Sequence, residues 1–495
     1  MLQDTGLGQE MFVSAYTKHE NGIQKTLCYR YTDDLVDIDT NQENVIPTDH
    51  LCERTIVYCV SPPGETSWLK NSSTSEALNN INIQEKPTPL PQKFPLPGTH
   101  HTAAIIKFYH DSESLRVGQL VDVIGILGSS DSNMVDTMDP EAQFDTHLTQ
   151  YKDVPVIHAI TYSTIDGKSG APFTKSQLDD MALQSRDIRG PLIDYIASYF
   201  GGDMLVAEFV LLQLLSKVST QRHGLKIGQF CLNITNFHPS SDPVPQKSTS
   251  SLQLSNGPSQ SVANMISNLV LHQVSIPLTL DVLNKSRFSP QSVNEDLISG
   301  VLQLVPGTHV LVDENELSEG QLGDTGVRNM QALINVIQHQ TLTYGFPYSQ
   351  FDFDMDLSFI TLSSGKSLLP NHCVIPLKPD YALEQNQAEN RTSPPKEELE
   401  VFRIYLQASK HASYEIPDNV SQYIQDDFVK ERKQASERQA PLPSQEDLMM
   451  RMNLCRLVAL SFGERVLTKE TYDYTVQLDQ GRKSRVLEHQ QKTSN

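Results

Sequence analysis

The chain has 495 residues, of which 38% are hydrophobic, and this length predicts two or three domains, each with its own core. Its 39 basic and 60 acidic residues give a formal net charge of −21, which repels a phosphate backbone and favours proteins as partners over DNA. The start has no signal-peptide pattern, no run reaches the length of a membrane span, and the six cysteines form no C-x-x-C pair, so we expect an intracellular protein with no disulfide framework or zinc site.

The first 130 residues are predicted to form a β-rich domain. Apolar or alternating runs predict strands at residues 11–16, 54–60, 103–109 and 120–127. Such short strands are typical of a five-stranded OB-like barrel, although an unspecified β-rich domain fits them equally well. The stretch near 70–97 is rich in Ser, Asn and Pro, and we expect a disordered insertion there.

The central part is predicted to be an α/β domain over residues 176–381, after a linker at 131–175. Asp203 can cap a helix that is apolar around much of its circumference. Beyond it, strands and helices alternate as they do in a layered domain with a buried parallel sheet. The expected strands are 228–234, 310–312 and 357–362, and the expected helices are 262–271, 293–303 and 328–338.

The last part, over residues 401–495, is predicted to be a helical domain that follows a second polar linker at 382–400. Apolar residues at spacings of three and four predict helices around 420–428 and 448–462. Thr468 can cap a third helix, with Glu470 in its first turn. The predicted fold class is therefore α+β with several domains.

Asp313 and Glu314 end the apolar run that begins at Gly307. Nucleotide hydrolases end the strand that holds Mg²⁺ in this way, so Asp313 would hold the metal's water shell and Glu314 would polarise the attacking water. The chain has no G-x-x-x-x-G-K-[ST] phosphate loop, which predicts an ATPase scaffold without its phosphate site. Alternatively, the two acidic residues only mark where the strand leaves the core.

Lys247 and Ser248 are the nearest substitute for a phosphate loop. Pro243 and Pro245 remove amide donors just before them, so a backbone nest for phosphate would form poorly. A second match, residues 365–367, follows the Asp-Glu strand instead of preceding it. We therefore assign Lys247, Ser248, Asp313 and Glu314 to a vestigial nucleotide site, and predict no catalytic residue, metal site or cofactor.

Several runs of the sequence resemble the MCM-binding protein family, where MCM denotes minichromosome maintenance. They lie at residues 59–68, 94–98, 297–322, 329–344, 363–370 and 402–406. Family members carry a further segment upstream, so the chain is expected to begin inside its first barrel. The same runs are similar to the replicative MCM helicase. In that ATPase, a strand ends in Asp-Glu, a helix runs into a hairpin, and a sensor strand ends in Asn, where this chain has Ser.

The resemblance implies an OB-like barrel over 1–130, a degenerate AAA+-like domain over 176–381 and a lid over 401–495. It also implies a non-catalytic nuclear regulator of DNA replication that binds MCM helicase subunits. Such a protein would promote unloading of the helicase from chromatin and its assembly, and would support sister chromatid cohesion. It would reach chromatin indirectly, with no membrane partner and no sequence-specific DNA binding. The alternatives are a weak ATPase, in which Lys247 and Ser248 still bind ATP, and an OB protein that binds single-stranded nucleic acid.

Overall fold

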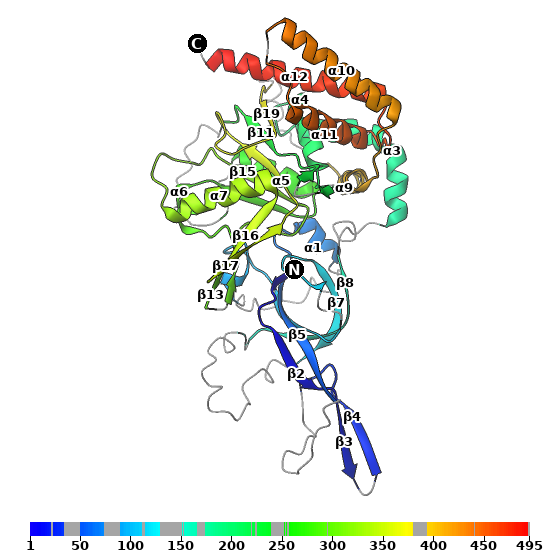
Figure 1. Cartoon of the computed structure of the whole chain (residues 1–495), viewed down its shortest axis with the longest axis vertical. Coiled ribbons are helices and arrows are strands. Elements are labelled where there is room, and N and C mark those ends of the chain that lie inside the picture. Colours follow the sequence, from blue (N-terminus) through cyan, green and yellow to red (C-terminus); the bar gives the residue numbers. More distant parts are fainter. Residues whose placement is uncertain are drawn as a thin grey trace.

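The computed structural model describes most of the chain, as a mixed α/β protein with several sheets and helices (Figure 1). The β-rich part lies at one end and the C-terminal helices lie at the other. No helix in the described part is long and apolar enough to span a membrane. The described residues are 1–20, 23–33, 50–73, 90–110, 114–128, 151, 153–165, 174–218, 220–222, 225–238, 252, 254, 257–294, 296–379, 394–439 and 441–493.

The N-terminal sheet has the strand order β1-β5-β6-β8-β7, and β2 also pairs with β5. Its strands are β1 (Leu2–Asp4), β2 (Gln9–Val13), β5 (Leu51–Val60), β6 (Ala103–Phe108), β7 (Val121–Leu127) and β8 (Val156–Thr164). Only β6 and β8 pair in parallel. The two ends of the sheet meet because Leu2 N donates to Gln119 O at 2.9 Å and Gly118 N donates to Leu2 O at 2.7 Å. The predicted strand 11–16 is broken at Ser14, where β3 (Ala15–Glu20) begins and pairs with β4 (Ile23–Cys28) as a hairpin.

Residues 90–97, expected within a disordered insertion, instead cover one face of this sheet. After the short helix α1 (Ser67–Ser73), the 3-10 helix η2 (Pro91–Lys93) places Lys93 in the interior, with none of its side chain exposed. Lys93 Nζ lies 2.6 Å from Asp4 Oδ2 and 2.5 Å from Asp296 Oδ1. Asp4 belongs to the N-terminal sheet and Asp296 to the central part. The two ion pairs of Lys93 therefore link the N-terminal sheet to the central part.

The central sheet is parallel, with the strand order β12-β15-β18-β11-β19. Its strands are β11 (Leu232–Thr235), β12 (Gln273–Pro277), β15 (Thr308–Asp313), β18 (Leu357–Leu362) and β19 (Cys373–Pro376). Leu311 and Ile360 face one hydrophobic cluster, whereas Val310 and Phe359 face another on the opposite side. Burial of both faces explains why these strands are continuous apolar runs, as the sequence predicted.

Helices cover both faces of the central sheet. On one side lie α3 (Lys175–Ala197), α4 (Met204–Leu214) and α5 (Pro258–Leu269), and on the other α6 (Leu280–Lys285) and α7 (Asp324–His339). Asp203 caps α4 as predicted, since its Oδ1 accepts from Val206 N at 3.2 Å. Between α7 and β18, β16 (Thr341–Phe346) and β17 (Ser349–Asp354) form a projecting hairpin.

The predicted helix at 293–303 was wrong. The chain instead forms β13 (Gln291–Val293) and β14 (Asp296–Ile298), followed by turns. The cause is tertiary: β13 pairs with β16, and Gln3 Nε2 of the N-terminal sheet donates to Leu297 O at 3.1 Å. These contacts outweigh the helical spacing of the apolar residues.

Four helices form the C-terminal part: α9 (Lys396–His411), α10 (Asp418–Glu437), α11 (Gln445–Ser461) and α12 (Lys469–Thr493). The three predicted helices are confirmed as α10, α11 and α12, and Thr468 Oγ1 accepts from Thr471 N at 3.2 Å. The missed helix α9 begins within the expected linker 382–400 and packs against α3 and α5. Likewise, β8 lies within the expected linker 131–175. The domain boundaries themselves stay predictions.

Candidate functional site

The acidic strand end lies at the carboxyl edge of the central sheet. Asp313 is the last residue of β15 and pairs in register with Leu362, the last residue of β18. Strand β11 lies on the other side of β18, so Thr235 and Ser363 reach the same edge. Open α/β sheets bind their ligands at this edge. Asp313 and Glu314 therefore lie at the carboxyl edge of the parallel sheet, and their part in a vestigial nucleotide site stays a prediction.

Asp313 is bound by the protein itself. Its side chain is buried, at 2% exposure, and Oδ1 accepts from Asn315 N and from Asn315 Nδ2, both at 3.0 Å. The hydroxyl of Ser259, in the first turn of α5, also hydrogen-bonds this carboxyl. Burial raises the pKa of Asp313 above its ordinary value, because those bonds only partly offset the lost solvation. A group held in this way is poorly placed to bind Mg²⁺.

Glu314 has internal partners as well. Its Oε1 accepts from the hydroxyl of Ser367 at 2.9 Å and from Leu368 N at 3.2 Å. Burial raises the pKa of Glu314, and the bonds from Ser367 and Leu368 act against that rise. Ser367 belongs to the Gly-Lys-Ser match that chain order excluded as a phosphate loop. In the structure, Ser367 and Leu368 of this loop donate hydrogen bonds to Glu314, the residue predicted to polarise the attacking water.

The start of α5 is unsuited to holding phosphate. A helix that follows the first strand of a nucleotide hydrolase offers free backbone amides to the phosphates. Here the first helical residue is Pro258, which has no N–H, and Ser259 is engaged with Asp313. Lys247 and Ser248 lie outside the described residues, so their part in the vestigial site stays a prediction.

Ser363 directly follows β18, the strand that the resemblance likens to the sensor strand. Its hydroxyl accepts a bond from Asn233 Nδ2 at 2.9 Å and lies 3.0 Å from Gly365 O. Asn233 Nδ2 also donates to Thr361 O at 3.2 Å. This serine therefore binds inward, to β11 and to its own loop. Across the described residues, no group of three or more His, Cys, Asp or Glu side chains is arranged to hold a metal ion.

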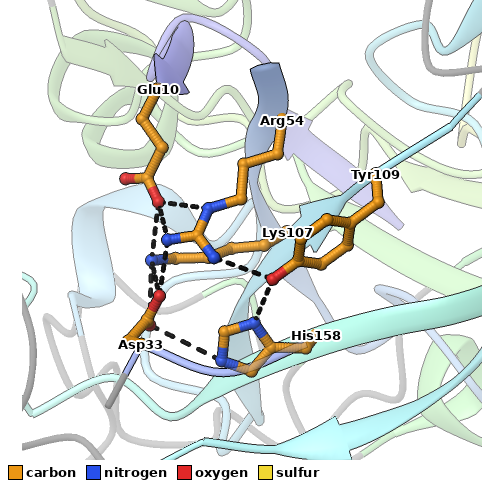
Figure 2. Close-up of polar contacts among 6 residues, drawn as sticks. All are labelled: Glu10, Asp33, Arg54, Lys107, Tyr109 and His158. Carbon is orange, nitrogen blue, oxygen red and sulfur yellow. Dashed lines mark hydrogen bonds and ion pairs between the residues drawn. The ribbon is translucent and has the colours of Figure 1, made fainter. Parts of the chain in front are cut away.

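A second polar cluster lies on the N-terminal sheet, and sequence reasoning missed it (Figure 2). Lys107 Nζ is 2.9 Å from Asp33 Oδ2 and 3.0 Å from Glu10 Oε1. Arg54 forms ion pairs with the same two carboxylates. Figure 2 shows the two cations between these acids and a pair of ring side chains. The cluster comprises Glu10, Asp33, Arg54, Lys107, Tyr109 and His158.

This cluster neutralises itself, because two cations face two carboxylates. Burial disfavours the charged form of Asp33, but Lys107 and Arg54 outweigh it, so the pKa of Asp33 lies below its ordinary value. Burial lowers the pKa of His158, whose Nδ1 bonds the hydroxyl of Tyr109 at 2.7 Å. The charges of the cluster are paired within it, which is typical of a structural network. His158 Nε2 lies 3.5 Å from Asp33 Oδ2 and has no hydrogen-bond partner in the described part of the chain. The signal in the sequence was Lys107, the single charge in the apolar strand β6, whereas Arg54 directly follows Glu53 in β5.

Comparisons with known proteins give a consistent likeness. The family model described as "Mini-chromosome maintenance replisome factor" matches residues 1–93 and 76–486. The chain is 26% identical over 584 residues to the mini-chromosome maintenance complex-binding protein of Danio rerio, covering 100% of this chain and 88% of the relative. It is 28% identical over 466 residues to the Homo sapiens protein of that name, covering 87% and 68%. The Arabidopsis thaliana protein is 27% identical over 549 residues, covering 98% and 87%.

Proposed function

Because this chain belongs to the mini-chromosome maintenance replisome factor family, we propose that it binds subunits of the MCM helicase as a non-catalytic partner in DNA replication. The observation that carries the non-catalytic part is the internal bonding of Asp313 and Glu314. Relatives across vertebrates and a plant are named for binding the MCM complex. Together these findings favour a binding protein over an ATPase.

The strand orders support the finer fold assignments within this proposal. In the central sheet, β11 is the first strand along the chain, and it lies between β18 and β19, the fourth and fifth. The third strand, β15, lies between β12 and β18, the second and fourth. This order fits a degenerate AAA+-like domain. In the N-terminal sheet, the parallel pairing of β6 with β8 and the meeting of its ends fit an OB-like barrel. The helices α10, α11 and α12 would then correspond to the lid.

A subunit of this kind resembles its partners in shape but cannot turn over nucleotide. It could therefore occupy a place beside working helicase subunits, and its binding would not depend on ATP. In this way it would promote release of the helicase from chromatin, maintain its assembly and support sister chromatid cohesion. We therefore expect the protein to act in the nucleus and to reach chromatin through the helicase.

The hairpin β16–β17 is our proposed contact element for a helicase subunit. Its tip exposes three aromatic side chains: Phe346 is 36% exposed, Phe351 is 56% exposed and Tyr348 is fully exposed. Residues 341–354 contain no Lys or Arg, so the hairpin lacks the charge that nucleic acid requires. Its own acidic residues are Asp352 and Asp354, and Asp354 is paired with Lys226 Nζ at 2.7 Å. Aromatic side chains are enriched at protein interfaces, and an apolar surface with a basic rim would complement this tip.

Co-purification with helicase subunits tests the proposal. The tagged full chain should recover MCM subunits in near-stoichiometric yield from a nuclear extract in which they are abundant, both with ATP and after its removal. Failure in such an extract would refute MCM binding. Calorimetry with ATP and Mg²⁺ tests the weak-ATPase alternative, since magnesium-dependent binding would favour it. A steep salt dependence of oligonucleotide binding would favour the single-strand-binding alternative.

A further inference from the structure

A cavity of about 350 Å³ lies at the amino edge of the central sheet, away from Asp313. One wall belongs to the N-terminal sheet. It is formed by Leu120, which directly precedes β7, and Ile165, which directly follows β8. The starts of β12, β15 and β18 form its floor, and α9 and the chain after α4 close it. Neither the helicase contact nor the vestigial nucleotide site uses this cavity.

The cavity is lined by more cations than anions. Lys217 and Lys410 face it, whereas Asp356 is the one acidic residue among those that line it. Asp356 Oδ1 is already engaged, since it accepts from Val218 N at 3.0 Å. Three imidazoles add further donors, those of His272, His309 and His411. A basic cavity is unexpected in a chain with a net charge of −21.

Lys410 is buried without a carboxylate partner among the described residues. It is 7% exposed, and its Nζ lies 3.2 Å from Nε2 of His309. Burial lowers the pKa of Lys410, and the charge of Asp356 acts in the opposite direction without reversing the shift. Burying an unpaired ammonium opposes folding. Such a group is usually kept for function, because selection for stability alone would replace it.

His309 adds a second donor beside Lys410. Because Lys410 donates to Nε2, the proton of the neutral imidazole resides on Nδ1. This Nδ1 is buried and has no hydrogen-bond partner in the described part of the chain. Burial also lowers the pKa of His309, and the charge of Lys410 lowers it further. The N–H groups of Lys410 that do not bond His309 thus have no acceptor in the described part of the chain, and an anionic oxygen would supply one. His309 Nδ1 points to the opposite side of the ring and would need a separate acceptor.

We propose that this cavity binds a small organic anion. Its phosphate or carboxylate group accepts hydrogen bonds from Lys410, and its apolar part contacts Leu120, Ile165 and Leu406. The volume lies at the lower end of the range of about 300–1,000 Å³ that small-molecule sites occupy. The proposal does not depend on helicase binding, because the cavity and the hairpin β16–β17 involve different residues.

Calorimetry on the full chain tests anion binding, with phenyl phosphate and benzoate as the two anions and benzamide as a neutral molecule of similar shape. At least one anion should bind with a dissociation constant below about 1 mM, and benzamide at least about tenfold more weakly. Stronger binding of phenyl phosphate would identify a phosphate site, and stronger binding of benzoate a carboxylate site. Absence of binding by both anions, or equal binding of benzamide, would overturn the proposal.

The variant Lys410→Met tests the role of the ammonium. It should weaken anion binding at least about tenfold, and should raise the Tm of the ligand-free protein by about 2 °C, because a buried unpaired charge is removed. Lys433→Met makes the same change at an exposed position of α10 and should alter neither quantity. Unchanged affinity in Lys410→Met would overturn the proposal. If that variant does not fold, Leu120→Trp, which fills the cavity, decides the matter: it should lose binding, and retained affinity would refute the site.

Discussion

The side chain of Gln340 exchanges two hydrogen bonds with the backbone of Leu357. Its Nε2 donates to Leu357 O at 2.9 Å, and its Oε1 accepts from Leu357 N at 2.8 Å. Gln340 also ends α7 in the left-handed conformation, with φ of 50°. One buried residue therefore sets where the helix stops, where the hairpin β16–β17 starts and where β18 begins.

Gln340→Ala should lower the free energy of unfolding by about 2–4 kcal/mol, because it leaves the N–H and C=O of Leu357 unpaired in the interior. Gln340→Gly removes the same bonds but relieves the strain of a side chain at positive φ, so it should be the less damaging of the two. Urea denaturation measures both. Gln338→Ala, at an exposed position of α7, is the matched control. A loss below about 1 kcal/mol in both variants would contradict the structural role of the Gln340 side chain.

Lys93 should be essential to the join between the N-terminal sheet and the central part. Lys93→Met leaves the carboxylates of Asp4 and Asp296 buried without a cation, which should cost about 3–5 kcal/mol of stability. Denaturant unfolding measures the loss, with the exposed Lys433→Met as the control. Adding Asp296→Asn to Lys93→Met should restore part of the stability, because one uncompensated charge is removed. A double variant as unstable as the single one would argue against the charge explanation.

The parts of the fold that were predicted correctly have local signals. Strand β18 has the predicted bounds, 357–362, because a strand buried on both faces is a continuous apolar run. The helices α10 and α11 follow from apolar residues at spacings of three and four. The start of α12 follows from the capping residue Thr468, and the start of α4 from Asp203. Each of these signals lies within a short stretch of sequence.

The missed elements depend on contacts between distant residues. Strand β8 lies in a stretch expected to be a linker, and its pairing with β6 joins Ile105 to Val156. At the candidate site, the position of Asp313 and Glu314 was predictable from the strand pattern. Their partners Ser259 and Ser367 lie about fifty residues away along the chain, and no local pattern links them. Such pairings appear only once the sheet order is known.

His272 should make stability depend on pH. Burial, together with the nearby charge of Lys410, lowers its pKa from 6.5 to about 4. Above pH 6.5 the histidine is neutral in both states, but as pH falls below 6.5 the unfolded chain takes up a proton that the folded chain refuses. Between pH 7 and pH 5 this should cost the fold about 2 kcal/mol.

His272→Gln should remove that part of the pH dependence. Unfolding free energies of the ligand-free protein at pH 7 and pH 5 measure it, and the drop should be smaller in the variant by about 2 kcal/mol. The same substitution at the exposed His339 controls for the change of residue type. If His272→Gln loses as much stability as the unaltered chain between these pH values, the burial of His272 does not govern the effect.

Asp313→Asn and Glu314→Gln should leave helicase binding intact. Burial already raises the pKa of both carboxyls, so an amide of the same shape should cost at most about 1–2 kcal/mol of stability. In a working ATPase, each substitution would abolish hydrolysis. Co-purification with MCM subunits, together with a phosphate-release assay, measures both properties. A loss of measurable ATP hydrolysis in the variants would show that the unaltered chain is an enzyme.

The exposed aromatic residues of the hairpin β16–β17 should be needed for helicase binding. Replacing Tyr348 and Phe351 by Ser removes large apolar contacts from a tip that does not support the core, so binding should weaken at least about tenfold while the Tm stays within about 2 °C. Titration against purified MCM subunits measures the affinity. Leu487→Ser, at a position on α12 that is 59% exposed, is a control of the same character. Equal loss in the control, or full affinity in the hairpin variant, would move the contact elsewhere on the protein.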